Sequence, residues 1–197
     1  LLIGAVEFSK HCLEVLIENE SGVVAVFTLD REHAAFNSDF ADLSQLADAA
    51  DIELVKVQNI NESENVDLIK HIDPDVIFVF GWSQIISKEV LNIPPLGCIG
   101  THPAMLPENR GRHPIIWSLV DGLDHGGLSF FFLDEGADSG DILWQQPFKI
   151  DIEDDARSVY DKIKSLASLA ISEFLPRLER GNPTRIPQNH DFATYRR

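Results

Sequence analysis

Residues 73–80, Asp-Pro-Asp-Val-Ile-Phe-Val-Phe, decide the fold class. The proline at position 74 ends any helix that precedes it, because it lacks an N–H donor and clashes with the preceding turn. Five apolar residues then follow without a polar interruption, which is typical of a parallel strand buried on both faces. The run is far shorter than the ~20 residues needed to span a bilayer. We therefore expect residues 76–80 to form a central strand of an open sheet.

Outward from this run, apolar segments of strand length alternate with segments of helical period. The expected strands are residues 1–5, 23–28, 54–57, 76–80, 129–133 and 142–150. The expected helices lie over 12–17 and 43–50, after a cap at Ser63, over 114–120, and over 159–178, where Gly181-Asn182-Pro183 ends the last one. This alternation predicts an α/β fold, Rossmann-like, with a mostly parallel twisted sheet and helices on both faces. We expect one catalytic domain over residues 1–181 and a short tail over 182–197.

Composition narrows the class of protein. The 197 residues are 44% hydrophobic and 24% charged, as in ordinary globular domains. The formal net charge of −16 repels a phosphate backbone, so nucleic acid is not an expected partner. Cys12 and Cys98 fit buried thiols in a reducing compartment, which favours a cytoplasmic protein. No apolar run has transmembrane length and no basic leader precedes position 1, so we expect neither a membrane partner nor a signal peptide.

Chemistry is expected in two loops. In open α/β sheets, ligands bind beyond the carboxyl ends of the strands, which points to residues 81–86 and 100–113. His102 ends a strand and is followed by a proline, so it is pre-organised as a general base, and Asp138 could orient or charge it. The alternative for the acidic stretch 134–141 is a solvated turn with its carboxylates in water.

Other chemistries lack their signatures. The histidines have no short metal-ligand spacing, so we expect no metal. The first strand is not followed by the glycine pattern of dinucleotide or nucleotide phosphate loops. No G-x-S-x-G elbow supports a serine hydrolase.

Three segments carry a resemblance. Residues 97–111, GCIGTHPAMLPENRG, resemble the H-x-S-L-L-P-x-x-R-G segment of the folate-dependent formyltransferases. Residues 133–143, LDEGADSGDIL, resemble the second motif of that family, and Asp138 falls 36 positions after His102, as the family's catalytic aspartate does. Residues 80–86, FGWSQII, resemble the loop that lines its folate pocket. The resemblance covers nearly the whole chain and implies the fold expected above.

This resemblance implies transfer of a formyl group from 10-formyltetrahydrofolate to an amine, through a tetrahedral oxyanion and without a metal. It implies that His102 is the base and that Asp138 holds the imidazole and relays protons. Contacts to the folate co-substrate are implied for the following residues: Gly81, Trp82, Ser83, Gln84, Ile85, Asp134, Gly136 and Ala137.

One position departs from the family. An asparagine two residues before the histidine donates to the oxyanion, and here that position is Gly100. Strand alternation places positions 100 and 102 on the same side, so we expect Gly100 to leave an open slot beside His102. Gly100, Asn109, Arg110 and His113 are the candidate oxyanion or substrate contacts, with Asn109 or His113 as the replacement donor.

The acceptor is expected to be a small molecule. Methionyl-tRNA formyltransferases carry a further basic domain that these residues do not include, and glycinamide ribonucleotide formyltransferases carry a glycine-rich phosphate loop where this chain has Ala5-Val6-Glu7-Phe8. Residues 187–195, PQNHDFATY, resemble the end of the sugar N-formyltransferases, which implies a nucleotide-linked amino-sugar. The alternatives are a formyltetrahydrofolate hydrolase and, because of Gly100, a non-catalytic binding protein of this fold. A homodimer is left open.

Overall fold

The computed structural model describes residues 1–30 and 39–196, and the chain forms two units, Leu1–Ile99 and Gly100–Arg197. Strand β5 (Cys98–His102) carries the chain from the first unit into the second.

The first unit is built on parallel strands. Its strands are β1 (Leu2–Ile3), β2 (Ala25–Leu29), β3 (Glu53–Val57) and β4 (Ile77–Val79). Their order is β3-β2-β1-β4, and each neighbouring pair is parallel. The connecting helices are α1 (Glu7–Glu18), α2 (Ser44–Ala49) and α3 (Ser63–Ile72), and α4 (Lys88–Leu91) follows β4.

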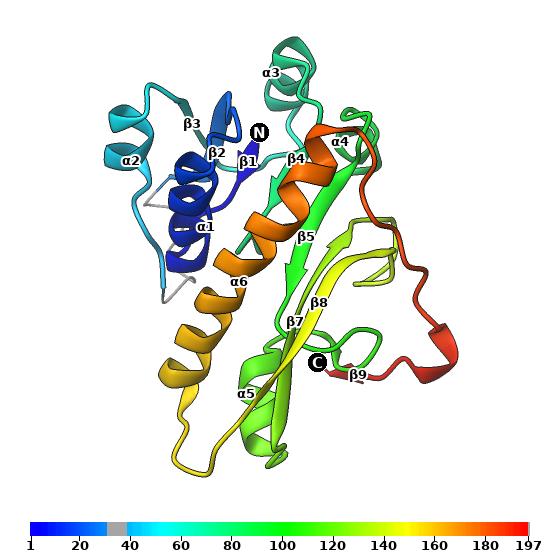
Figure 1. The fold of residues 1–197 in the computed structure, drawn as a ribbon. Coiled ribbons are helices and arrows are strands. Elements are labelled where there is room, and N and C mark those ends of the chain that lie inside the picture. The colour runs from blue at the N-terminus through cyan, green and yellow to red at the C-terminus, as the bar shows by residue number, and fades with distance from the viewer. Residues whose placement is uncertain (31–38, 197) are drawn as a thin grey trace. The chain divides into compact units, whose positions relative to one another are not determined.

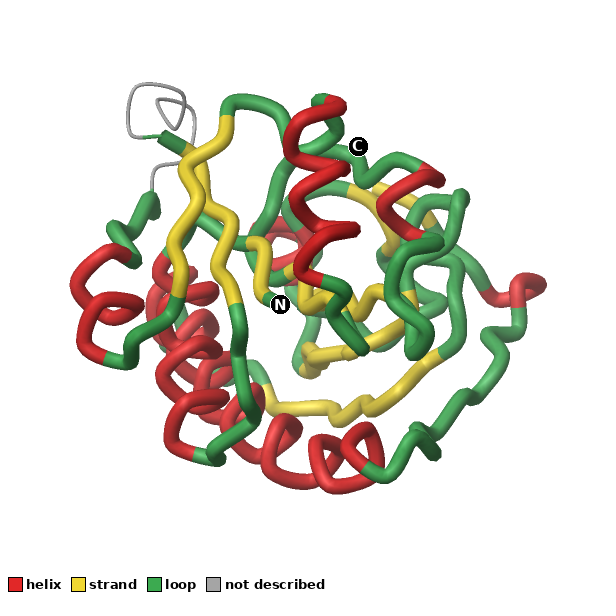
Figure 2. Tube along the Cα trace, turned by 90° about the horizontal axis from the view of Figure 1, so that it is seen from above, coloured by secondary structure: helices red, strands yellow, loops and turns green. Residues whose placement is uncertain are grey.

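The strand order places these helices on both faces. Successive strands are added on one side of β1, as β2 and then β3, and β4 is added on its other side. Crossover connections between parallel strands are right-handed, so a reversal of direction moves the connecting helix to the other face. Helices α1 and α2 therefore lie on one face and α3 on the other, as Figure 2 shows for this unit.

The second unit contains an antiparallel pair. Strand β7 (His125–Phe132) pairs with β8 (Ile142–Lys149), with a register irregularity between Phe130 and Phe131. Helix α6 (Ala156–Glu179) runs along both strands (Figure 1). Helix α5 (Pro114–Val120) packs on β7 and α6. The tail forms a short 3-10 helix, His190–Phe192, and β9 (Tyr195–Arg196), which pairs in parallel with β6 (Arg110–Gly111).

Most expected elements are confirmed, and the differences have local causes. The α/β class is correct, and the helix over 114–120 begins at its proline. The prediction that Ser63 caps α3 is wrong: Glu62 has the extended backbone of the cap, and Ser63 is the first helical residue. Strand β7 starts four residues earlier than expected, because its polar beginning pairs with the end of β8.

Both cysteines are free and buried. Burial raises the pKa of the Cys12 thiol well above its ordinary value and that of Cys98 to about 12. Within residues 1–30 and 39–196, no helix is long and apolar enough to cross a membrane.

Candidate catalytic site

His102 is held at the end of β5 by one strong hydrogen bond. Its side chain is 6% exposed, and its Nε2 lies 2.7 Å from the carbonyl oxygen of Asn109. Because a carbonyl only accepts, Nε2 carries the proton and donates it. In the neutral ring Nδ1 is therefore the unprotonated, basic nitrogen.

Asp138 lies on the open side of this ring. Its Oδ2 is 3.8 Å from His102 Nδ1, and the carboxylate side chain is 24% exposed. The same Oδ2 accepts a hydrogen bond from the backbone N–H of Gly111 at 2.9 Å. Asp138 has a left-handed backbone, with φ of +52°, which is uncommon for residues other than glycine but less so for aspartate and asparagine.

This arrangement is suited to moving a proton. A separation of 3.8 Å is too long for a hydrogen bond between Nδ1 and Oδ2, yet it is within ion-pair reach. When Nδ1 accepts a proton, the resulting imidazolium faces a carboxylate while Nε2 still donates to Asn109. Hydrogen bonds of this kind are often long before the substrate binds. The pair therefore has the geometry of a general base with a neighbouring counter-charge.

The open slot expected beside Gly100 is absent. A Cβ atom at this position would lie 2.6 Å from Leu133 Cδ2 and 3.2 Å from Leu133 Cγ. Leu133 is itself packed on a buried cluster that includes Phe131. The space that an asparagine side chain would take is thus filled by leucine.

Asn109, His113 and Arg110, the other candidate oxyanion or substrate contacts, differ in exposure and in hydrogen bonding. Asn109 supplies the carbonyl for His102, while its backbone N–H donates to Thr194 Oγ1 at 2.8 Å. His113 is exposed and occupies the N-cap position of α5 with a left-handed backbone, without a capping hydrogen bond from its side chain. Arg110 is only 1% exposed and points into the protein.

Arg110 binds the C-terminal tail, which the motifs alone did not indicate. Its guanidinium donates to Tyr195 Oη at 2.9 Å and to Gln188 Oε1 at 2.5 Å, and lies 3.1 Å from His190 Nδ1. Gln188 in turn donates to the carbonyl oxygen of Asp138 at 2.9 Å. The resemblance of the tail was used only to predict the acceptor class and did not indicate these contacts.

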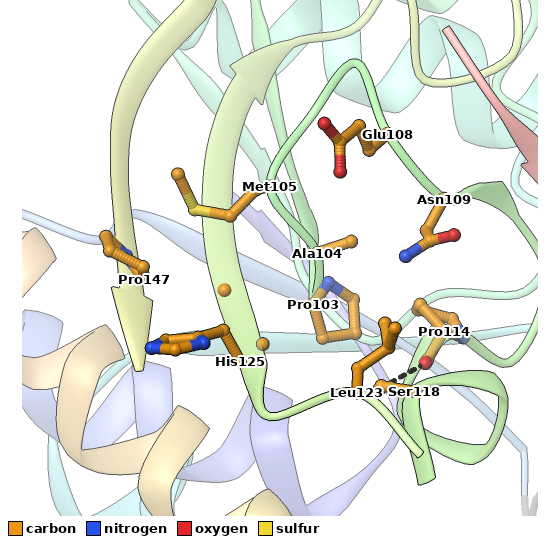
Figure 3. A pocket seen from close by; sticks show the side chains of 12 residues that line it. Pro103, Ala104, Met105, Glu108, Asn109, Pro114, Ser118, Leu123, His125 and Pro147 are labelled. Carbon is orange, nitrogen blue, oxygen red and sulfur yellow. Dashed lines mark hydrogen bonds between the residues drawn. The ribbon is translucent and has the colours of Figure 1, made fainter. Parts of the chain in front are cut away.

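A hollow of about 180 Å³ is lined in part by the loop that follows β5. Its lining combines Pro103, Met105 and Pro147 with the polar side chains of Glu108 and Asn109 (Figure 3). Neither His102 nor Asp138 lines it.

The predicted folate contacts fall in two loops. In the second unit, Asp134, Gly136 and Ala137 are exposed, and Asp134 Oδ1 accepts from Gly136 N–H at 2.9 Å and Ser139 Oγ at 2.7 Å. These bonds shape the turn that ends at Asp138.

In the first unit, the loop over residues 81–86 is fixed by its amides. Gln84 accepts from the N–H of Ile60 at 3.1 Å and donates to the carbonyl of Gln58 at 2.7 Å. Trp82 packs on Ala5 and Leu29. Gly81 begins the loop with a left-handed backbone, whereas Ser83 and Ile85 are exposed. Contact with folate stays a prediction for both loops.

No cluster suited to a metal is found in the described part of the chain, where no three or more His, Cys, Asp or Glu side chains gather in a suitable group.

Comparisons with a family model and with known sequences point to the same family. Residues 1–175 match the family model described as formyl transferase. The methionyl-tRNA formyltransferase of Clostridioides difficile (strain 630) is 30% identical over 197 residues, covering 99% of this chain and 64% of that protein. The one of Alkaliphilus metalliredigens (strain QYMF) is 34% identical over 197 residues, with 99% and 63% covered. The chain thus spans less than two thirds of the length of these curated relatives.

Solved structures share the fold. A sugar N-formyltransferase from Shewanella sp FDAARGOS_354 gives a TM-score of 0.76 at 18% identity, covering 99% of this chain and 74% of that one. An N-formyltransferase from Helicobacter canadensis, solved with folinic acid and dTDP-3-aminofucose, gives 0.74 at 19% identity, covering 99% and 69%. Since the family model covers most of the sequence and the fold agrees with these structures, the chain belongs to the formyl transferase family.

Proposed function

We propose that this protein transfers a formyl group from 10-formyltetrahydrofolate to the amine of a small acceptor. The observation that carries the proposal is the pairing of a basic His102 Nδ1 with the Asp138 carboxylate at 3.8 Å. Family membership supports formyl transfer, and the folinic acid bound in the Helicobacter canadensis structure supports a folate-type donor.

The proposed chemistry begins with attack of the neutral amine on the formyl carbon. His102 Nδ1 takes the proton that the attacking nitrogen loses, and Asp138 stabilises the imidazolium that forms. The donor's N10 then leaves with a proton returned from the same ring. The Asn109 carbonyl keeps the ring orientation constant through both transfers, because it binds Nε2–H in either charge state.

The oxyanion needs a donor other than the missing asparagine. The backbone N–H groups of Asn109 and Gly111 are already used, by Thr194 and Asp138 respectively. The side chains of Asn109 and His113, the imidazolium of His102 and water stay candidate sources. We propose that the positive charge on His102 does part of this work.

A nucleotide-linked amino-sugar is the first candidate acceptor. The net charge of −16 disfavours a polyanionic acceptor, since like charges repel at long range. The fold shared with the Shewanella sugar N-formyltransferase, and with the Helicobacter canadensis enzyme solved with dTDP-3-aminofucose, supports the same class. We further propose a cytoplasmic location, in line with the two free thiols.

Methionyl-tRNA is a second candidate, favoured by a separate observation. The sequence relatives at 30–34% identity carry that name, whereas identity to the sugar enzymes is 18–19%. The two acceptors make opposite predictions for salt dependence: RNA binding weakens steeply with added salt, and binding of a small acceptor does not.

The deciding experiment supplies 10-formyltetrahydrofolate with a panel of nucleotide-linked amino-sugars, with methionyl-tRNA, or with no acceptor, and follows the mass of each product. A formylated sugar nucleotide supports the proposal. Formylated methionyl-tRNA would show that methionyl-tRNA is the acceptor and that the amino-sugar is not. Folate turnover without an acceptor indicates the hydrolase. Folinic acid binding without any turnover indicates a binding protein. The His102→Ala variant is the control for contaminating activity.

A further inference from the structure

Gln188 of the C-terminal tail touches the loop that carries Asp138. Its side chain is buried, and its Nε2 donates to the carbonyl oxygens of Asp138 at 2.9 Å and Gly140 at 2.7 Å. Its Oε1 accepts from the guanidinium of Arg110 at 2.5 Å. The orientation of the amide is unique, because a flipped amide would set donor against donor at Arg110 and acceptor against acceptor at both carbonyls.

The hydrogen bonds from Gln188 hold the backbone of the loop at Asp138 and Gly140. The Asp138 backbone is left-handed, with φ of +52°, and residues 134–137 before it are exposed. The two hydrogen bonds from Gln188 fix the peptide carbonyls on both sides of Ser139. These hydrogen bonds therefore help to set the position of the Asp138 carboxylate.

Arg110 anchors the amide from the other side. It is 1% exposed, and its side-chain partners are Gln188, Tyr195 and His190. No carboxylate within the described residues lies at ion-pair distance from it. A buried charge without a carboxylate partner is costly to deprive of a hydrogen bond, so the position of Gln188 is tightly determined.

The same tail fixes the segment that contacts both catalytic side chains. Arg110 N–H donates to the carbonyl of Thr194 at 2.9 Å, and Arg112 N–H donates to the carbonyl of Arg196 at 3.2 Å. The approach is so close that a Cβ on Gly111, where φ is +104°, would lie 2.1 Å from the Arg196 carbonyl oxygen. Gly111 is the residue whose N–H binds the Asp138 carboxylate.

We propose that Gln188 is a positioning residue, which sets the Asp138 carboxylate relative to His102 Nδ1 through the carbonyls of Asp138 and Gly140. The expected fall in kcat rests on the proposed function. The positioning of the Asp138 carboxylate by Gln188 does not. Gln188 is then the residue through which the tail acts on the proposed catalytic pair.

The kinetic test compares two variants of Gln188. Gln188→Glu keeps an acceptor for Arg110 and turns that contact into an ion pair, but it loses both donors to the Asp138 loop. Gln188→Ala loses all three bonds. We expect each variant to lower kcat at least ~10-fold, since displacements of an ångström in a catalytic group have effects of this size. We also expect the pH profile of kcat/KM to change its shape. A smaller folded fraction would scale the whole profile and leave its shape unchanged.

The matched control is Asn189→Ala, at the exposed neighbour of Gln188. Within residues 1–30 and 39–196, the Asn189 side chain accepts only from the N–H of Asp191. We expect its kcat and pH profile to equal those of the wild type. The proposal is overturned if Gln188→Glu folds and retains wild-type kcat and profile, because Arg110 would then be the only reason for the glutamine.

A second measurement does not depend on formyl transfer. The ¹⁵N signals of the His102 ring, assigned by their loss in His102→Gln, report the groups next to Nδ1. We expect Gln188→Glu and Asp138→Asn to move the Nδ1 signal, and Asn189→Ala to leave it in place. An unmoved signal in Gln188→Glu overturns the positioning role. An inactive wild type in which this signal still moves contradicts the proposed function alone.

Discussion

Leu133 occupies the space in front of Gly100. A Cβ at position 100 would lie 2.6 Å from Leu133 Cδ2, closer than atoms in contact can approach. The glycine and the leucine are therefore a matched pair: the absence of one side chain accommodates the other. An asparagine cannot be restored at position 100 without moving Leu133.

We expect Gly100→Asn alone to destabilise the protein by about 1–3 kcal/mol, as overpacking of a filled site does. The double variant Gly100→Asn/Leu133→Ala makes room for the amide and is expected to recover part of this loss. Urea unfolding of the wild type, both single variants and the double variant measures the coupling. Additive effects of the two substitutions would contradict the matched pair.

We expect His102→Ala and Asp138→Ala each to lower formyl transfer by ~10²-fold or more, because in the proposed mechanism His102 takes the proton and Asp138 stabilises the resulting imidazolium. Steady-state kinetics with near-saturating donor measures this effect. Circular dichroism and thermal unfolding establish that the variants fold. A folded variant with a near-normal rate would remove that residue from the mechanism.

We expect a folate analogue to change the emission of Trp82, if the loop over residues 81–86 contacts the donor. Its indole nitrogen is buried and has no hydrogen-bond partner within the described structure, so its environment is sensitive to a new neighbour. Titration with folinic acid is followed in the wild type, Trp82→Phe and Trp144→Phe. The signal should vanish in Trp82→Phe and persist in Trp144→Phe, whose indole donates to Glu173 at 2.7 Å in the wild type. The reverse result would place the donor elsewhere.

Asp154 contributes stability that acid removes. Hydrogen bonds from Lys162, first, and then from the Asp151 N–H and Ser158 lower the pKa of its carboxyl from 3.8 to about 2. Because the folded-state pKa lies below the unfolded value, the contribution is complete above about pH 4 and is lost as pH falls toward 2. We expect the difference in unfolding free energy between wild type and Asp154→Asn to shrink over that interval. Urea unfolding at several pH values measures it, and a constant difference would exclude the effect.

The sequence by itself determined most local elements and pointed to His102 and Asp138 as a candidate pair. The uninterrupted apolar run before Gly81 predicts a buried parallel strand, and Pro114 predicts the first turn of α5, because each depends on neighbours along the chain. His102 and Asp138 were found from two motifs at a set spacing, and the structure brings them to 3.8 Å.

Only the tertiary structure decided the surroundings of that pair. Leu133 fills the space at Gly100 because of how β5 and β7 are set side by side, and strand alternation along one strand gives no information on its neighbour. Gln188 reaches Arg110 across 78 positions. Such contacts depend on register and on close packing between distant segments, which no local pattern of residue types encodes.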